Sequence, residues 1–284
     1  MIKCVEFQNK TFATKEELFD SLREHKKQII DIKCSTVYKS VEKGASLYAR
    51  PIDISKLDES VKSKFSDDDK NWNIAVNTTK ILDSHMDLHV DGLWNKTKKE
   101  QRYKNYLVDS HVMSIQTTIA KKGDVDIITS KVPFSVLGYD YDGNTEALIY
   151  VIPKDKIIDS KAKDWLESGD PIESSVRMQY VKIELAMDSK NPNDENEKKL
   201  YDEWIGQIAN KKEFDEIYYF WVVKEAKNIG ESSLVLAGSN YVTGVLNTKE
   251  NTDEPLQSTH TENKENSRQS DTMFDFKQLK VINN

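Results

Sequence analysis

The sequence has few of the residues that mark several common protein classes. Only two of its 284 residues are cysteines, Cys4 and Cys34, which are too few for a disulfide framework and have no partners at metal-ligand spacing. No run of about 18 apolar residues occurs, and residues 1–7 lack the apolar core of a signal peptide. We therefore expect a soluble protein of a reducing, cytoplasmic setting that does not enter a membrane.

An excess of positive charge is also missing. The chain has 41 Lys and Arg against 48 Asp and Glu, which gives a formal net charge of -7. Phosphate binding needs a local surplus of Lys and Arg, whereas here the lysines are spread among acidic residues. The composition therefore argues against a nucleic-acid partner.

Composition and patterning divide the chain into three parts. Residues 1–71 are expected to form an N-terminal β-α-β segment and a charged linker, with a capping box at residues 14–17 starting the helix and residues 29–34 forming the second strand. Residues 72–246 contain most of the alternating, strand-like segments. Residues 247–284 are expected to be a disordered tail with a short apolar end segment, because residues 247–272 have almost no large apolar side chain.

The longest predicted strand covers residues 175–187 and indicates the kind of sheet. Its apolar side chains lie on even positions up to Tyr180 and on odd positions from Val181 onward. Such a change of phase predicts a bulge or strong twist, which is typical of curved sheets and barrels. We therefore predict an α+β protein with a compact, β-barrel-like sheet and flanking helices.

Three of the five histidines lie between residues 77 and 111, and two of them raise the question of a metal site. The possible ligands are His85, His89, Asp83, Asp87 and Asp91. Histidines four residues apart converge on a helix, but residues 86–90 alternate like a strand, where positions 85, 87, 89 and 91 share one face. This pattern favours a solvent-facing side of the sheet, and we expect no metal and no cofactor. A metal cage there would instead indicate a β-rich binding module of another system.

Four segments in order resemble one enzyme family. They are residues 77–97 (with Leu-Asp-Ser-His-Met-Asp-Leu-His-Val-Asp-Gly-Leu-Trp), residues 107–111 (Leu-Val-Asp-Ser-His), residues 174–183 (Ser-Ser-Val-Arg-Met-Gln-Tyr-Val-Lys-Ile) and residues 230–243 (beginning Gly-Glu-Ser-Ser-Leu-Val-Leu). Together they are similar to segments of the prohead maturation proteases of tailed bacteriophages, serine peptidases that share the assemblin type of fold with herpesviruses. The resemblance covers roughly residues 72–245.

The resemblance implies a catalytic set. His111 matches the family's catalytic histidine, Ser175 lies in the segment that resembles the strand of the nucleophile, and Glu231 lies in the segment that resembles the closing Glu-x-Ser-x-Val strand. Acyl transfer by serine needs such a base, a group that orients the base, and donors for the oxyanion. Asp109, His85 and His89 remain alternatives to Glu231.

Two features of the nucleophile segment leave choices open. Ser174 is an alternative to Ser175, which we prefer because it directly precedes the Val-x-Met-x-Tyr strand. Arg177 occupies a position where many family members have glycine. It is either an oxyanion-stabilising charge or an exposed strand residue.

The resemblance also implies a function. The expected protein is a serine endopeptidase that cleaves scaffold and capsid precursors, and itself, during head maturation. Its partners would be the major capsid protein, scaffold precursors and further copies of itself, inside the assembling prohead in the host cytoplasm. The alternative is a non-catalytic virion or scaffold protein with the same fold.

Overall fold

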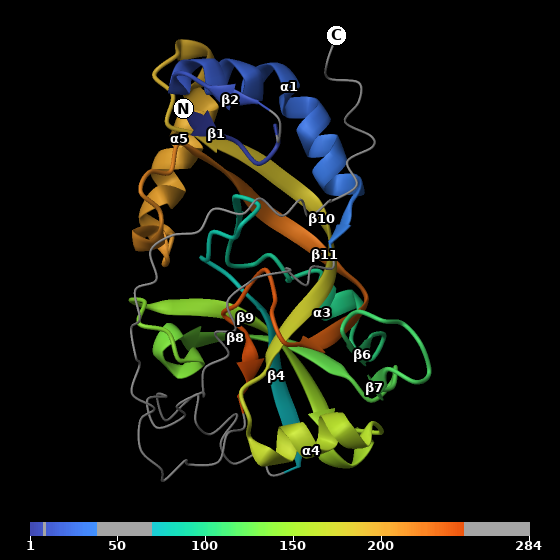
Figure 1. Ribbon diagram of the computed structural model, residues 1–284. Helices are drawn as coiled ribbons and strands as arrows, with labels where there is room; N and C mark the ends of the chain where they lie inside the picture. Colours follow the sequence, from blue (N-terminus) through green and yellow to red (C-terminus); the bar gives the residue numbers. More distant parts are fainter. Residues whose placement is uncertain (8–9, 39–69, 247–284) are drawn as a thin grey trace. The chain divides into compact units, whose positions relative to one another are not determined.

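The computed structural model describes residues 1–7, 10–38 and 70–246 (Figure 1). Most of the predicted linker, and the predicted tail with its apolar end segment, lie outside these ranges. The described residues all belong to one compact unit. The boundary between residues 71 and 72 stays a prediction.

A mixed sheet of six strands carries the candidate site. Its order is β3-β10-β11-β6-β7, with β5 as a further partner of β11. The strands are β3 (Val37–Tyr38), β5 (Asp87–His89), β6 (Tyr106–Asp109), β7 (Thr118–Ala120), β10 (Glu173–Met187) and β11 (Tyr219–Val235). The two longest, β10 and β11, are antiparallel, whereas β5 and β6 pair with β11 in parallel. Figure 1 shows β10 and β11 side by side over most of their length.

The predicted irregularity in β10 is present. The pairing of β10 with β11 shifts register between Tyr180 and Lys182, and again beside Lys182. Val181 at the shift is exposed, whereas Tyr180 and Ile183 on either side are buried. A bulge therefore explains the change of phase in the sequence. A further shift between Val176 and Met178 leaves Arg177 unpaired with β11.

A second sheet has four antiparallel strands in the order β12-β4-β9-β8. They are β4 (Asn71–Thr78), β8 (Asp126–Pro133), β9 (Asn144–Pro153) and β12 (Gly244–Val245). Ile74 and Val76 of β4 belong to the main core with Val176 and Trp221, while Ala75 packs in a second cluster on the other face. Because both faces of β4 are covered, almost the whole strand is buried.

The α+β class is confirmed, but the expected compact barrel is wrong. The described strands form separate sheets of two, six and four strands, and none of these sheets is a closed barrel. The six-stranded sheet ends at β3 and β7, which are two and three residues long and do not pair with each other in the described part of the chain. Such short edge strands leave the sheet open. The two-stranded sheet is β1 (Ile2–Lys3) with β2 (Thr11–Phe12).

Helix α1 (Lys15–Ser35) starts as predicted and ends later than predicted. Thr14 Oγ1 accepts a hydrogen bond from the backbone N of Glu17, as in a capping box, and Glu17 Oε2 accepts one from the backbone N of Ala13, the residue before the N-cap. The strand expected at residues 29–34 is wrong, because α1 continues through them. Ile29 and Lys33 are both buried, and their four-residue spacing places them on one face of the helix.

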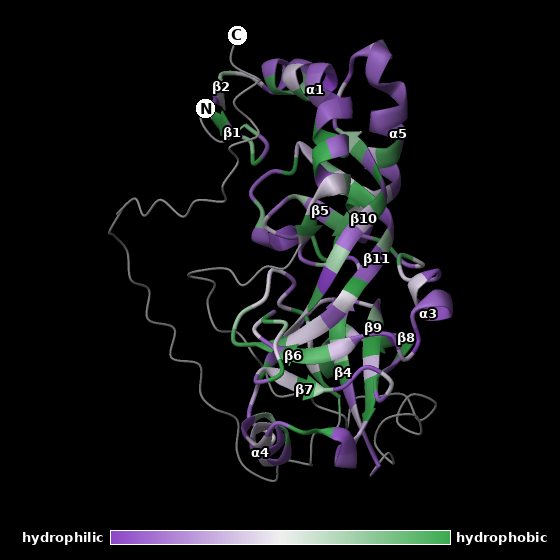
Figure 2. Ribbon diagram, turned by 90° about the vertical axis from the view of Figure 1, so that its right-hand side faces the viewer, coloured by the Kyte–Doolittle hydropathy of each residue, from purple (hydrophilic) through white to green (hydrophobic). Residues whose placement is uncertain are grey.

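The remaining helices are short and lie toward the outside. They are α3 (Thr97–Glu100), α4 (Ser160–Ser168) and α5 (Glu195–Trp204), with 3-10 helices at Phe134–Leu137, Lys154–Lys156, Pro192–Asp194, Ile205–Gln207 and Lys211–Glu213. Helices α1, α3 and α5 are mainly hydrophilic in Figure 2, whereas β4 and β9 carry more hydrophobic residues. None of the helices in the described ranges has both the length and the apolar content to cross a membrane.

Candidate functional site

The register of β10 and β11 brings three polar residues to one face of the sheet. Ser175 stands directly opposite Ser233 in the antiparallel pair, so both side chains point to the same side. Glu231 lies two residues before Ser233 on the same strand and shares this face. A hydrogen bond from Ser233 Oγ to Glu231 Oε2, 3.1 Å long, agrees with this arrangement.

The turn after β6 brings His111 to the same face. Strand β6 pairs in parallel with Glu231–Leu234 of β11 and ends at Asp109. Ser110 and His111 then adopt positive φ values of 48° and 58°, a left-handed conformation that residues with a side chain rarely take. Two hydrogen bonds tie this turn to β11, from Ser110 N to the carbonyl oxygen of Leu234 and from His111 N to Ser233 Oγ.

His111 and Glu231 form a buried hydrogen-bonded pair. His111 Nδ1 lies 2.9 Å from Glu231 Oε1 and 3.2 Å from Oε2. Glu231 is fully buried and His111 is 8% exposed. An ionised carboxylate only accepts hydrogen bonds, so Nδ1 carries the proton, and in the tautomer with this single N–H the lone pair lies on Nε2. This is the tautomer in which a histidine accepts a proton from a nucleophile.

The third contact of a complete triad is not formed. His111 Nε2 is enclosed and has no hydrogen-bond partner among the described residues. Ser175, which is 8% exposed, donates no hydrogen bond within the same part of the chain. The structure thus joins His111 to Glu231 and brings Ser175 to their face without a hydrogen bond from Ser175 to His111. In free enzymes catalytic hydrogen bonds are often long and shorten only around the substrate, so this geometry is compatible with catalysis.

Ser174 and Ser175, the two candidate nucleophiles, have different surroundings. Ser174 Oγ donates to the carbonyl oxygen of Ala75 at 2.6 Å, and the backbone of Ser174 exchanges two hydrogen bonds with Thr243 Oγ1. Ser174 therefore points to the side of β4, opposite to the face of Ser175 and Ser233. This geometry favours Ser175 over Ser174 as the candidate nucleophile.

The other candidates for the third member lie elsewhere or point away. Asp109 is exposed and accepts a hydrogen bond from the hydroxyl of Ser110. His85 lies beside Asp83, 3.9 Å from Nδ1 to the carboxylate, and His89 belongs to β5 with its own buried partners. Glu231 alone among these candidates forms a hydrogen bond with His111 in the described part of the chain.

The face of β5 that was expected to meet solvent is buried, and that expectation is wrong. Asp87 and His89 are 1% and 3% exposed. Lys33 of α1 forms an ion pair of 2.6 Å with Asp87, and Tyr180 OH donates to the other carboxylate oxygen of Asp87 at 2.9 Å. His89 Nε2 lies 3.1 Å from Tyr180 OH. A cation and a hydroxyl from neighbouring elements thus allow these polar side chains to be buried.

These contacts also bear on the metal alternative. Asp83 Oδ1 accepts hydrogen bonds from the backbone N atoms of His85 and Asp87, both at 2.9 Å. Among the described residues, no group of three or more His, Cys, Asp and Glu side chains is arranged to hold a metal ion.

Neighbouring residues keep His89 neutral. Trp94 Nε1 donates to Asn77 Oδ1, so the Asn77 amide turns its Nδ2 donor toward His89 Nδ1. His89 Nδ1 is then an acceptor, and Nε2 donates to Tyr180 OH. Burial is the largest cause that lowers the pKa of His89, to about 4.

A pH titration of stability is expected to reveal this buried histidine. The folded-state pKa of His89 lies below its unfolded value, so the unfolded chain takes up the proton first and His89 costs stability as the pH falls from about 6.5 to about 4. The stability advantage of wild type over His89→Gln, measured by urea unfolding, should therefore decrease by about 3 kcal/mol across this range. The comparison with the variant is needed because burial raises the pKa of Asp87 to about 6, which has the opposite effect on stability. Parallel curves for the two proteins would contradict the prediction.

Arg177 lies near the candidate nucleophile but outside the regular ladder. It follows Ser175 by two residues and occupies the bulge between Val176 and Met178. Its Nε atom is enclosed without a hydrogen-bond partner in the described ranges. The residue is half-buried, so it is not a fully exposed strand residue, and an oxyanion-stabilising role stays a prediction.

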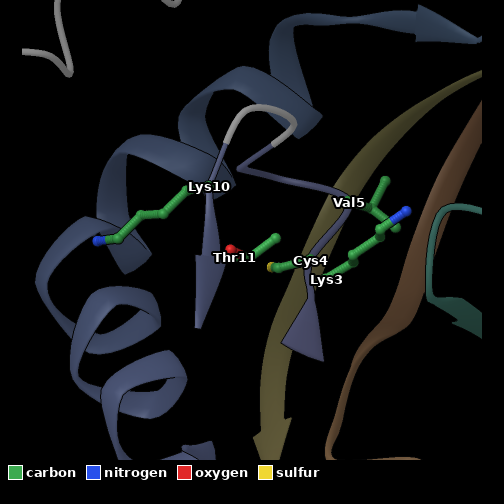
Figure 3. A pocket seen from close by; sticks show the side chains of 5 residues that line it. All are labelled: Lys3, Cys4, Val5, Lys10 and Thr11. Atoms are coloured by element: carbon green, nitrogen blue, oxygen red, sulfur yellow. The ribbon is translucent and has the colours of Figure 1, made fainter. Parts of the chain in front are cut away.

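A pocket near the N-terminus lacks the features of a catalytic site. It has a volume of about 330 Å³ and is lined by Lys3, Cys4, Val5, Lys10 and Thr11. Figure 3 shows that the side chain of Lys10 points away from Lys3 and Val5, so the charged groups do not converge. Burial raises the pKa of Cys4 to about 12, which keeps its thiol protonated and unreactive.

Sequence reasoning missed Ser233, which bonds both His111 and Glu231. The signal was present, because the alternation of a strand places residues two apart on one face. Glu231 and Ser233 have this spacing.

Comparisons with known proteins return no relative. The chain matches none of the models of known protein families, and no curated protein and no solved structure matches it.

Proposed function

We propose that the chain is a serine endopeptidase in which Ser175 attacks the peptide carbonyl and His111 accepts the hydroxyl proton. Glu231 orients the imidazole and stabilises the positive charge that it gains. By the resemblance of its four segments, we assign it to head maturation. It would cleave scaffold and capsid precursors and itself inside the assembling prohead, and its fold would be of the assemblin type.

One observation carries the proposal. His111 is held by a fully buried carboxylate through Nδ1, while its enclosed Nε2 has no partner among the described residues. Buried polar atoms are nearly always hydrogen-bonded, so an unpaired one calls for an explanation. A proton-accepting role explains it, because a base must keep this lone pair available on the face that Ser175 shares.

The surface beside His111 suits a polypeptide substrate. Val112 and Met113 are each 49% exposed and Ile115 is 90% exposed, directly after the candidate base. The loop is held by its own hydrogen bonds, including Thr117 N to Ser114 Oγ and Thr118 Oγ1 to the carbonyl of Ser114. Apolar side chains presented in this way gain most by contact with apolar side chains of a partner chain.

An alkyl fluorophosphonate, which reacts with activated serines, tests the chemistry. We expect intact mass to show one adduct, and peptide mass spectrometry to locate it on Ser175. Ser175→Ala should abolish the adduct and His111→Ala should slow its formation strongly, while Ser174→Ala should still be labelled. An adduct on Ser174 would transfer the role of nucleophile to that residue.

A non-catalytic virion or scaffold protein is the second candidate function. The observation in its favour is the missing hydrogen bond between Ser175 and His111. It would be supported if the reagent labelled no serine in the free protein or in particles assembled with its capsid and scaffold partners.

A further inference from the structure

Ser233 occupies the centre of the candidate site and is fully buried. Its Oγ accepts a hydrogen bond from the backbone N of His111 at 2.8 Å and donates one to Glu231 Oε2 at 3.1 Å. It also stands directly opposite Ser175 in the ladder between β10 and β11. One hydroxyl thus contacts both His111 and Glu231 and neighbours the candidate nucleophile.

From these contacts we infer that Ser233 is a positioning residue, which holds the base and its carboxylate in the arrangement that the proposed hydrolysis needs. The inference rests on the proposed function and adds a residue to it. Ser233 acts through His111 and Glu231.

The first contact fixes the backbone of the base. Ser110 and His111 both have positive φ values, and residues with side chains hold such a conformation only where surrounding contacts enforce it. The hydrogen bond from His111 N to Ser233 Oγ is one of two bonds that tie this turn to β11. Removing this hydrogen bond lets the turn relax and displaces the His111 imidazole, including Nε2, the atom that must meet Ser175.

The second contact fixes the carboxylate. The Ser233 hydroxyl donates a hydrogen bond to Glu231 Oε2, while Glu231 Oε1 accepts the shorter hydrogen bond from His111 Nδ1. A carboxylate that receives this additional hydrogen bond is a weaker base. Without Ser233, Oε2 loses this donor, and the carboxylate is free to turn and change the direction in which Oε1 meets His111 Nδ1.

Ser232 provides a matched control. It is the next residue on β11, it is equally buried, and its side chain lies on the other face of the strand, 3.5 Å from Asn228 Nδ2. Replacing either serine with alanine removes one buried hydroxyl from the same strand. A general loss of packing therefore affects both variants, whereas a positioning role affects only Ser233→Ala.

The test combines fluorophosphonate labelling with NMR of the His111 side chain, whose signals are assigned with His111→Gln. In Ser233→Ala we expect the labelling of Ser175 to slow on the order of 100-fold, because a small displacement of a catalytic group has an effect of this size. We also expect the NMR signal of the His111 Nδ1 proton, which reports the hydrogen bond to Glu231, to shift from its wild-type position. Ser233→Thr keeps a hydroxyl and should restore most of the rate. Ser232→Ala should behave like wild type in both measurements.

The outcomes separate this inference from the proposed function. An unchanged His111 Nδ1 proton signal in Ser233→Ala, or equal losses of labelling in Ser232→Ala, would overturn the positioning role. A wild type that is never labelled would overturn the proposed hydrolysis, while the NMR comparison would still decide whether Ser233 holds the His111–Glu231 pair. If Ser233→Ala does not fold, Ser233→Cys replaces it, because cysteine preserves much of the volume and is a weak donor.

Discussion

Alanine at Ser175 or at His111 is expected to lower the cleavage of capsid and scaffold precursors by about a thousandfold or more. In the proposed mechanism, the first change removes the attacking oxygen, and the second removes the group that accepts its proton. Because members of a triad act as a unit, the double variant should be hardly worse than either single variant. The measurement is the intact mass of products over time, after co-expression of each variant with the capsid and scaffold precursors that the proposed function assigns to it.

Two further variants make this result specific. His111→Ala leaves the buried Glu231 carboxylate without its main donor, so His111→Gln, which keeps a donor, distinguishes lost chemistry from a lost fold. Ser174→Ala removes a buried hydroxyl that bonds the carbonyl of Ala75 and should leave cleavage nearly intact. If cleavage continues in Ser175→Ala and stops in Ser174→Ala, Ser174 is the nucleophile. If neither the wild type nor any variant yields a product, the non-catalytic protein is favoured.

The sequence predicted best what depends on neighbouring residues alone. The capping box at Thr14 and Glu17 is such a feature, since both partners lie within one helical turn. The bulge beside Val181 is another, because a change of alternation within one strand requires a change of register. The prediction of a β-barrel-like sheet was wrong because closure depends on which edge strands pair, and alternation says nothing about the partner of an edge strand.

The wrong predictions for residues 29–34 and for the face of β5 are connected through helix α1. Residues 29–34 were expected to form a strand, and the alternating polar residues of β5 were expected to face solvent. In the structure α1 continues to Ser35, and its Lys33 neutralises Asp87. Lys33 of this helix and Tyr180 of β10 together allow Asp87 and His89 to be buried, so the polar face could not be interpreted without these distant contacts.

Only part of the candidate site was predicted from the sequence, because the rest also depends on distant contacts. His111, Ser175 and Glu231 were chosen by resemblance, and the structure brings His111 and Glu231 into direct contact. Ser233 needed the register of β10 and β11 to be noticed, because its importance comes from partners 58 and 122 positions away. The catalytic roles themselves stay predictions.

Lys33→Met is expected to destabilise the fold by about 3–5 kcal/mol, the usual cost of leaving a buried charge without its partner. Lys33 lies 2.6 Å from Asp87 and 3.5 Å from Glu6, and its side chain is 9% exposed. Burial opposes its charge, but the carboxylates of Asp87 and Glu6 outweigh that effect and raise the pKa of Lys33. Without the ammonium group, two carboxylates would be buried with no cation. Urea unfolding at pH 7 measures the loss as a lower midpoint.

Lys27 on the same helix provides a control for Lys33→Met, and Asp87→Asn provides a second change that should offset part of its effect. Lys27 forms an exposed pair with Asp31 one turn away, with 89% of its side chain exposed, so Lys27→Met should change stability by no more than about 0.5 kcal/mol. Asp87→Asn removes one of the uncompensated charges, so adding it to Lys33→Met should cost less than the sum of the single changes. Additive losses would mean that the two residues do not stabilise each other. The contribution of Lys33 to stability would then come from packing of its side chain against Trp221, whose ring centroid lies 5.5 Å from the ammonium nitrogen.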